Sequence, residues 1–354
     1  MAGLVSLCLL FTIVQVGYCK PSDPQVTKWY DVDMDSPADT RWSKVLNDYT
    51  QFVPNLLATI RQLVPVEVIP IAELIADDIE NLIPSPFAEE LLAVADGFGM
   101  LPGDTIALNI LYDLTAYCTS IVAQDEDGVI WHARNLDYYY GDLLRNMTIN
   151  VNFQRNNKTA YTGTTYAGYV GLVSGQRPNN FTITVDQRGH HVHVGHWWQN
   201  ILMAILDKKT SFVSFLVRQV LDTNTGFRDA VERLSTTPIH APVYYIVGGV
   251  NQGEGVVITR DRMTAVDQMY MNPAHGNFYV LETNYDNWTT PPPYDKERRA
   301  VAEKTMNALG TQGVNKQSMF NVISTRPVMN ENTTYSMVMS ASQPAVYSAW
   351  VRWP

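Results

Sequence analysis

The chain has 354 residues, of which 46% are hydrophobic and 17% charged, and its formal net charge at neutral pH is −10. This composition allows a large packed core and is not that of a disordered chain. It contains no long run of Lys and Arg, and phosphate binding needs clustered cations. The sequence therefore argues against nucleic acid as a partner.

The N-terminus carries an apolar run from Leu4 to Val16 that is too short for a comfortable membrane span. Small residues, Gly17 and Cys19, follow it. We interpret residues 1–19 as a secretory signal peptide cleaved before Lys20, the alternatives being an uncleaved anchor or a buried helix. Five N-x-Ser/Thr sequons are candidate glycosylation sites and fit entry into the secretory pathway: Asn146, Asn157, Asn180, Asn287 and Asn332.

The segment before Cys118 is rich in helix formers from Trp42 to Leu114, interrupted by prolines. Apolar residues at helical spacing form one such stripe: Leu56, Leu57, Ile60, Leu63 and Val64. A stripe of this kind normally packs on a core. The alternative is that one apolar face stays exposed and contacts lipid.

From Cys118 onward the pattern changes to alternating strands and helices. Strands are expected at 118–124, 129–137, Thr148–Phe153, Thr159–Tyr166, Tyr169–Val173, Phe181–Val185, Val243–Val250, Val256–Thr259, Ala265–Met269, Asn277–Thr283, Tyr335–Ser340 and Ala345–Val351. Helices are expected at His196–Lys208, Phe212–Asp222, Gly226–Leu234, Arg298–Leu309 and Gln317–Ser324. Two blocks of strands separated by helices predict layered sheets covered by helices.

Four histidines gather between the two strand blocks: His190, His191, His193 and His196. Such a cluster can bind a metal, but no other metal-binding motif accompanies it. We interpret it as a solvated loop and expect no metal.

The chain has three cysteines, Cys8, Cys19 and Cys118, and the first two would leave with the predicted signal peptide. The mature protein would hold one cysteine and no internal disulfide. The count alone leaves two interpretations open for Cys118, a catalytic thiol and a buried inert one.

A predicted hairpin places charged residues near Cys118. If Asp127-Gly128 is a two-residue turn, Cys118 faces Asp137, and Arg134 lies one residue from the position facing Ser120. If the turn shifts by one, Cys118 faces Asn135. In either register a thiol, a guanidinium and a carboxylate meet at one end of the hairpin, which is a plausible environment for an activated nucleophile.

The base that would activate the thiol is open at this point. His132 lies on the same predicted hairpin, and spacing alone leaves it as a candidate. The other candidate needs no side chain. If the bond between Tyr117 and Cys118 is cut, Cys118 gains an α-amine, whose pKa of about 7.7–8 suits it to take the proton of its own thiol.

The run CTSIVAQDEDGVIWHARNLDYYY, which begins at Cys118, resembles the start of the active subunit in the N-terminal-nucleophile amidases of the acid ceramidase family. Further similar segments are VNFQRNNKTAYTGTTYAGYVGLVSGQRP, PVYYIVGG, GEGVVITRDR and ETNYDNW. The stretches TAYTGTTYAGYVGL, VYYIVGG and SMVMSA are more similar to the branch that hydrolyses N-acylethanolamines.

The resemblance implies a role for each matching residue. Cys118 matches the nucleophile, and Arg134 and Asp137 match the pair that binds and orients its amine and thiol. Asn284 matches the oxyanion-hole donor, and Arg298 matches the arginine that follows that motif. Without the resemblance, Asn284 would be read as a turn residue after a strand.

Two positions depart from the family pattern. Gln187 stands where both branches usually carry a glutamate associated with acid-triggered self-cleavage. Glutamine can form hydrogen bonds but does not titrate. We therefore expect self-cleavage to be slower or less dependent on pH. Val173 stands where the amidase branch often has tryptophan and the ceramidase branch leucine, so the acyl pocket is expected to differ.

The resemblance implies an α+β fold, a four-layer αββα sandwich. Residues 20–117 would form a helical α subunit and residues 118–354 the catalytic β subunit, a heterodimer made from one precursor by autoproteolysis between Tyr117 and Cys118. It further implies lysosomal hydrolysis of saturated N-acylethanolamines, at a membrane surface or lipid micelle, without cofactor or metal. The alternatives are a ceramidase and, in a different class, a lipid-binding protein that never matures.

Overall fold

The computed structural model describes residues 23–64, 69–115, 117–189 and 210–354. The predicted signal peptide, the histidine cluster and the predicted helix at His196–Lys208 lie outside these ranges.

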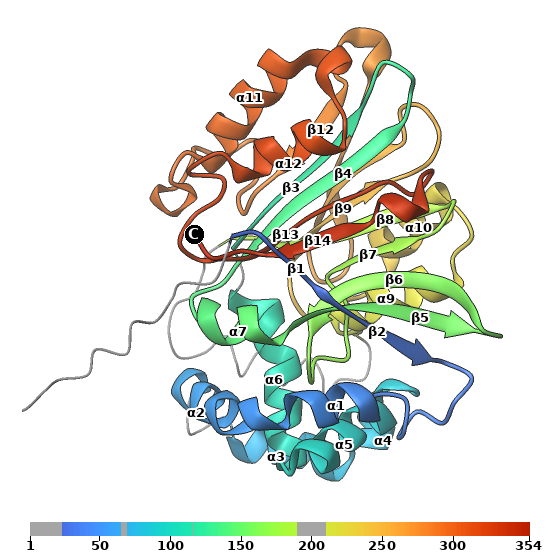
Figure 1. Ribbon diagram of the computed structural model, residues 1–354, viewed down its shortest axis with the longest axis vertical. Helices are drawn as coiled ribbons and strands as arrows, with labels where there is room; N and C mark the ends of the chain where they lie inside the picture. The colour runs from blue at the N-terminus through green and yellow to red at the C-terminus, as the bar shows by residue number, and fades with distance from the viewer. Residues whose placement is uncertain (1–22, 65–68, 116, 190–209) are drawn as a thin grey trace, which may run out of the picture.

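Two sheets form the centre of the molecule (Figure 1). The six-stranded sheet contains, in spatial order, β1 (Gln25–Val26), β14 (Ser348–Val351), β13 (Thr333–Met339), β4 (Ile130–Asp137), β3 (Tyr117–Gln124) and β12 (Tyr279–Glu282). The eight-stranded sheet contains β11 (Ala265–Tyr270), β10 (Gly255–Arg260), β9 (Val243–Gly248), β8 (Phe181–Gln187), β7 (Ser174–Arg177), β6 (Lys158–Tyr166), β5 (Thr148–Arg155) and β2 (Lys28–Asp33).

Helices cover the outer face of each sheet. The six-stranded sheet packs against α11 (Arg298–Gly313) and α12 (Lys316–Ser324), and the eight-stranded sheet against α9 (Val213–Thr223) and α10 (Phe227–Thr236). Between the sheets, apolar side chains of β3 and β4 meet those of β9 and β10. The predicted four-layer αββα sandwich is therefore confirmed.

The N-terminal segment supplies a further group of helices below the sandwich in Figure 1. They are α1 (Ser43–Tyr49), α2 (Val53–Leu63), α3 (Ile69–Asp77), α4 (Ile79–Leu82), α5 (Phe87–Phe98) and α6 (Pro102–Thr115). The predicted helical character of this segment is confirmed, but it also contributes strands. β1 pairs with β14 in one sheet, and β2 pairs in parallel with β5 in the other.

Most of the strands and helices predicted after Cys118 are present with small shifts of their ends. The strand expected at Tyr169–Val173 is wrong, because this segment turns back on itself after Gly168, which has a φ of +88°. Side chains satisfy its backbone: the Thr165 hydroxyl donates to the Tyr169 carbonyl, and the Val170 amide donates to Asn109. A helix that the sequence pattern did not predict, α7 (Gly141–Met147), begins just after β4.

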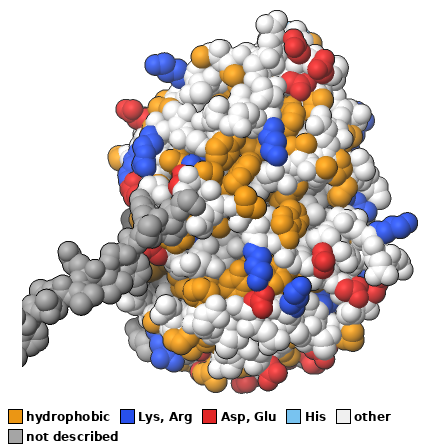
Figure 2. Space-filling view, viewed as in Figure 1, with side chains coloured by type: hydrophobic (Ala, Val, Ile, Leu, Met, Phe, Trp, Pro, Cys, Tyr) orange, Lys and Arg blue, Asp and Glu red, His pale blue; other side chains and the backbone are white. Residues whose placement is uncertain are grey.

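The apolar stripe on α2 packs into the core. Leu56 and Ile60 are each only 2% exposed, and Leu57 is half-buried. Among the described residues no single helix has the length and apolarity to cross a membrane. One pair of helices, Phe87–Phe98 and Pro102–Asn109, reaches that length and apolarity together, but the two are bent by 117° from each other. Lys and Arg are scattered over the face shown in Figure 2.

A buried charge cluster joins the N-terminal helices to the sandwich. Glu90 on α5 has no exposed surface, and Oε1 accepts hydrogen bonds from Arg41 at 2.9 Å and from Arg218 on α9 at 2.8 Å. Oε2 accepts from the Trp42 indole at 2.7 Å and again from Arg218. The carboxylate is thus fully satisfied, which is the condition under which a buried charge is tolerated.

Replacing Glu90 by alanine is expected to lower the free energy of unfolding by about 3–5 kcal/mol, because Arg41 and Arg218 would stay buried without their anion. Urea denaturation followed by circular dichroism measures this change. Glu80→Ala is the control, because Glu80 on α4 is exposed, and its expected change is within about 0.5 kcal/mol. Equal stabilities of the two variants would contradict this role of Glu90.

Candidate active site

The β3–β4 hairpin has a register that neither predicted turn gives. Cys118 faces Leu136, Tyr117 faces Asp137, and Ser120 faces Arg134. The connection is longer than a two-residue turn: the Asp125 amide donates to the Val129 carbonyl at 3.0 Å, and Gly128 adopts a φ of +85°. Such a loop, with glycine in the left-handed region, carries one more residue and shifts the pairing. Both predicted partners of Cys118 are therefore wrong.

The register decides which face each side chain occupies, because successive residues of a strand point to opposite faces. Ile121 and Ala123 pack against α11 and α12, whereas Val122 packs against the second sheet. Cys118 and Ser120 therefore face the second sheet. Arg134 lies on their face, and Asp137 lies on the opposite, helix-covered face.

The Cys118 thiol is completely buried beside a guanidinium. Arg134 Nη2 lies 2.9 Å from Sγ and donates to the Val185 carbonyl at 3.0 Å. Its Nη1 donates to the Val173 carbonyl at 2.7 Å and to the Ser174 hydroxyl. Burial raises the pKa of the thiol, and the positive charge of Arg134 opposes that shift. The thiol is therefore protonated in this state, with a cation in place to stabilise a thiolate.

Asn284 and Arg298 hold the backbone of Cys118. Asn284 Oδ1 accepts from the Cys118 amide at 3.0 Å and from Arg298 Nη2 at 2.9 Å. Arg298 Nη1 donates to the Cys118 carbonyl. The Asn284 amide nitrogen donates to the Gln187 carbonyl at 2.9 Å, so an oxyanion role would use its second N–H.

Asp137 lies at the end of β4 on the Arg298 side. Its oxygens accept hydrogen bonds from Thr333 and Asn330, each at 2.7 Å, and Oδ2 is 3.8 Å from Arg298 Nη1. Burial raises the pKa of Asp137, and Arg298 opposes the shift. Of the two charged residues predicted beside the thiol, Arg134 contacts Sγ, whereas Asp137 lies next to Arg298.

His132 does not contact the thiol. Its Nδ1 bonds to Thr182 at 2.8 Å and its Nε2 to Thr184 at 2.9 Å, both on β8. Burial lowers the pKa of His132 to about 3, so it is neutral. The ring is engaged at both nitrogens, which argues against its role as the base.

The two departures from the family pattern contribute through their backbones. Gln187 ends β8, and its carbonyl accepts the Asn284 bond. Val173 is buried, and its carbonyl accepts the Arg134 bond.

Sequence reasoning missed Asp186, a second carboxyl group at the site. It is fully buried on β8, its Oδ1 accepts from the Ser120 hydroxyl at 2.7 Å, and that oxygen lies 3.9 Å from Arg134 Nη2. Burial raises the pKa of Asp186 to about 7, although Arg134 lowers it. The available signal was alternation, since Thr182, Thr184 and Asp186 put polar groups on one face of an otherwise apolar strand.

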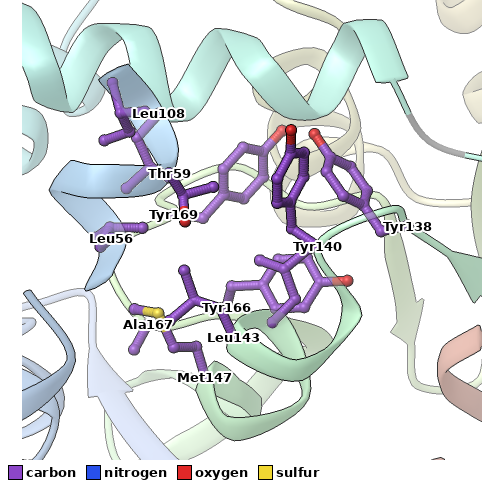
Figure 3. A pocket seen from close by; sticks show the side chains of 12 residues that line it. Leu56, Thr59, Leu108, Tyr138, Tyr140, Leu143, Met147, Tyr166, Ala167 and Tyr169 are labelled. Carbon is purple, nitrogen blue, oxygen red and sulfur yellow. The ribbon is translucent and has the colours of Figure 1, made fainter. Parts of the chain in front are cut away.

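Two pockets flank the end of β4. A polar pocket of about 220 Å³ is lined by Tyr117, Asp137, Tyr139, Tyr294, Lys296, Arg298, Pro327, Asn330, Glu331 and Asn332. An apolar pocket of about 40 Å³ lies between α2, α6 and α7, and its walls include Leu56, Leu108, Tyr138, Leu143 and Tyr166 (Figure 3). Asp137 faces Tyr117 across the hairpin and lines the polar pocket, and the next residue, Tyr138, lines the apolar one.

The geometry combines a thiol, a guanidinium and a polarised peptide, and this combination suits acyl transfer to sulfur. Residues 118–320 match the family model described as linear amide C–N hydrolases, choloylglycine hydrolase family. Residues 27–83 match the model described as the beta subunit of N-acylethanolamine-hydrolyzing acid amidase. The protein is thus an amide hydrolase of the N-terminal-nucleophile class. It belongs to the choloylglycine hydrolase family of linear amide C–N hydrolases.

Individual relatives agree with this assignment. The chain is 41% identical to the N-acylethanolamine-hydrolyzing acid amidase of Mus musculus, over 94% of this chain and 90% of that protein. It is 33% identical to the acid ceramidase of Homo sapiens, over 91% and 86% of the two chains. The solved structure of a Caenorhabditis elegans N-acylethanolamine-hydrolyzing acid amidase ortholog matches with a TM-score of 0.59 and 38% identity, covering 66% of this chain and 99% of that chain. The resemblance stated from the sequence is confirmed.

Replacing Arg134 by lysine is expected to lower the rate of amide hydrolysis about a hundredfold, because one ammonium cannot keep the contacts of the planar guanidinium to Sγ and three other acceptors. Hydrolysis of a fluorogenic fatty-acid amide measures the rate. Arg155→Lys is the control, since Arg155 forms a partly exposed ion pair with Asp222. Equal rates in the two variants would contradict a role of Arg134 at the thiol.

Proposed function

We propose that the protein hydrolyses saturated N-acylethanolamines to fatty acid and ethanolamine, after cutting its own chain between Tyr117 and Cys118. The observation that carries the proposal is the environment of Cys118. Its buried thiol contacts Arg134, and its backbone amide and carbonyl bind Asn284 and Arg298. The similarity to N-acylethanolamine-hydrolyzing acid amidases supports the substrate class.

In the self-cleavage step, the Cys118 thiol attacks the Tyr117 carbonyl carbon. The C–N bond breaks, the nitrogen takes up a proton to become the α-amine of Cys118, and water hydrolyses the resulting thioester. The cut would free the Tyr117 side chain, which now lies against Tyr139 and Tyr294 at the polar pocket. Its departure would open a path from that pocket to the buried thiol.

In turnover, the new α-amine takes the thiol proton, and the sulfur attacks the amide carbonyl of the substrate. Asn284 Oδ1 now accepts from this nitrogen and would orient the amine after the cut. The second N–H of the Asn284 side-chain amide would stabilise the oxyanion, an interaction worth roughly 3–4 kcal/mol in comparable hydrolases. The amine then protonates the departing ethanolamine, and water hydrolyses the thioester.

The two pockets support an N-acylethanolamine over ceramide. Lys296, Asn330 and Glu331 line the polar pocket, which suits a small polar leaving group such as ethanolamine. A ceramide would bring a second long hydrocarbon chain to this side. The apolar pocket, lined by α2, α6 and α7, suits the start of the acyl chain.

After the cut, residues 20–117 and 118–354 would stay together as a heterodimer. The contacts that support this are the β1–β14 and β2–β5 pairings and the ion pair between Glu90 and Arg218. Leu74 and Leu101, both more than half exposed, are the side chains that we assign to contact with a membrane or lipid micelle. Leu56 and Ile60 are too deeply buried for that role.

The cellular setting is also part of the proposal: signal cleavage after residue 19, lysosomal delivery and N-glycosylation. Asn146, Asn157 and Asn287 are exposed, and Asn180 and Asn332 are half-buried.

Self-cleavage predicts a specific fragment. Full-length protein held at about pH 5, and in parallel at neutral pH, should yield two bands on a denaturing gel, and N-terminal sequencing of the larger band should begin at Cys118. Cys118→Ala should remain one chain. An intact wild-type chain that still binds lipid would instead favour the lipid-binding protein that never matures. Turnover retained by Cys118→Ser after forced cleavage would contradict a thiol mechanism.

Substrate choice can be measured in one competition assay. With palmitoylethanolamide and ceramide present together, the ratio of kcat/KM values should favour the ethanolamide by at least about tenfold, a difference of about 1.4 kcal/mol in transition-state binding. A ratio that favours ceramide would replace the proposed substrate by the ceramidase alternative.

Gln187→Glu would restore a titrating group at the end of β8 and is expected to change the rate of self-cleavage at acid pH. Fragment formation is followed for both proteins from acid to neutral pH. Matching rates throughout would contradict the prediction that Gln187 alters maturation.

A further inference from the structure

The uncut chain leaves the thiol without the base that serves in turnover. The Cys118 nitrogen is then an amide that donates to Asn284, so it accepts no proton. Arg134, which donates to Sγ, is a cation and has no acceptor. The first cut therefore needs a different group to take the thiol proton.

Three titratable groups near the hairpin are already committed elsewhere. Asp137 lies on the opposite face of the sheet and accepts hydrogen bonds on both oxygens. His132 is bonded at both ring nitrogens. Glu282 on β12 shares the face of Ser120, and among the described residues its Oε2 is also buried without a hydrogen-bond partner. Its Oε1, however, binds Arg299 and the Thr283 amide, so this carboxyl group is paired with Arg299, whereas Asp186 lies near Arg134, the residue that contacts Sγ.

We propose that Asp186 takes the proton of the Cys118 thiol in the uncut chain and so starts self-cleavage. This role rests on the proposed function, which requires that cut. Cys118 Sγ and Asp186 Oδ1 lie 2.9 Å and 3.9 Å from the same nitrogen, Arg134 Nη2. The thiol and the carboxyl group are thus both held beside one cation, between the two sheets.

The free oxygen of Asp186 is the second observation. Within the part of the chain that the structure describes, Asp186 Oδ2 is buried and has no hydrogen-bond partner. A buried acceptor without a donor is costly, and a proton on Oδ2 would relieve that cost. Interaction with the Cys118 thiol also lowers the pKa of Asp186, which means that the thiol favours the charged carboxylate.

The other oxygen is anchored by a chain of hydroxyl groups. Ser120 donates to Asp186 Oδ1 at 2.7 Å, Thr184 donates to Ser120 at 2.8 Å, and Thr184 is bonded to His132. These bonds fix the carboxyl group through Oδ1 and leave Oδ2 for the thiol proton. Asp186 therefore has the position of a general base and an oxygen that is free to accept a proton.

The step balances without another reactant. The proton moves from Sγ to Asp186 Oδ2, the sulfur forms a bond to the Tyr117 carbonyl carbon, and the carbon–nitrogen bond to Cys118 breaks. The same proton returns from Asp186 to the departing nitrogen. Water then hydrolyses the thioester, which restores the thiol and leaves Tyr117 with a carboxylate.

The charges around Asp186 determine the direction of the pH dependence. Arg134 on β4 and Arg298 on α11 favour its carboxylate, whereas the Cys118 thiolate on β3, Glu282 on β12 and Tyr335 on β13 would oppose it when ionised. Burial outweighs the cations and raises the pKa of Asp186 to about 7. Because the base is active when deprotonated, self-cleavage should slow by about tenfold per pH unit below that value and level off above it.

The experiment follows fragment formation by freshly translated, radiolabelled full-length chain between pH 5 and pH 9. Wild type should show a rate that rises to a plateau with a midpoint near the pKa of about 7. Asp186→Asn should cut at least about a hundredfold more slowly, with no midpoint, because it keeps the shape but not the basicity. Ser120→Ala should move the midpoint upward by about half to one pH unit, since it removes a hydrogen bond to the charged form.

Ser340→Ala is the matched control, because Ser340 is also buried and bonds to the Ile130 carbonyl. It should keep the wild-type profile. Asp186→Asn cutting at the wild-type rate, a wild-type rate that falls as pH rises, or an unmoved midpoint in Ser120→Ala would each overturn the role of Asp186. The midpoint of Ser120→Ala tests the role of Asp186 even if Asp186→Asn fails to fold.

The two proposals fail in different ways. If wild type yields no fragment beginning at Cys118, the self-cleavage in the proposed function is wrong, and the role of Asp186 falls with it. If wild type yields that fragment while Asp186→Asn yields it equally fast, only the role of Asp186 is wrong.

Discussion

The contact between the Arg134 guanidinium and the Cys118 sulfur is the interaction on which the site depends. Arg134 is completely buried, and its two terminal nitrogens bond to the Val173 and Val185 carbonyls, the Ser174 hydroxyl and Sγ. A buried cation is tolerated only when such partners surround it. Loops and strands of the second sheet supply these acceptors, so the position of the thiol depends on how the two sheets pack.

The sandwich also explains why the segment before Cys118 is integral to the protein. It adds β1 to one sheet and β2 to the other, and Glu90 on α5 binds Arg218 on α9. Part of the apolar pocket comes from α2 and α6 of this segment, and the rest comes from the chain after Cys118 (Figure 3). A cut before Cys118 would therefore leave the sandwich and the pocket held together by contacts between the two pieces.

The hydrophobic pattern predicted most of the elements, because apolar residues recur with helical spacing in α2 and α9 and form a short continuous run in β9. It failed at Tyr169–Val173, where side-chain hydrogen bonds replace strand pairing, and at β2, whose partner β5 is more than a hundred residues away. The hairpin register depended on a loop one residue longer than the Asp-Gly turn suggested. Cys118, Arg134 and Asp137 followed from the sequence and the resemblance, but Asp186 required knowledge of which strand faces β3.

The most direct test of the account is to detect the acyl group on Cys118. The mature enzyme is mixed with palmitoylethanolamide, quenched in acid within the first turnover, and analysed by mass spectrometry of the fragment that begins at residue 118. The account predicts one palmitoyl group as a thioester on Cys118, which hydroxylamine removes. Turnover without any adduct on Cys118, or an acyl group that maps to another residue, would contradict the claim that this thiol is the nucleophile.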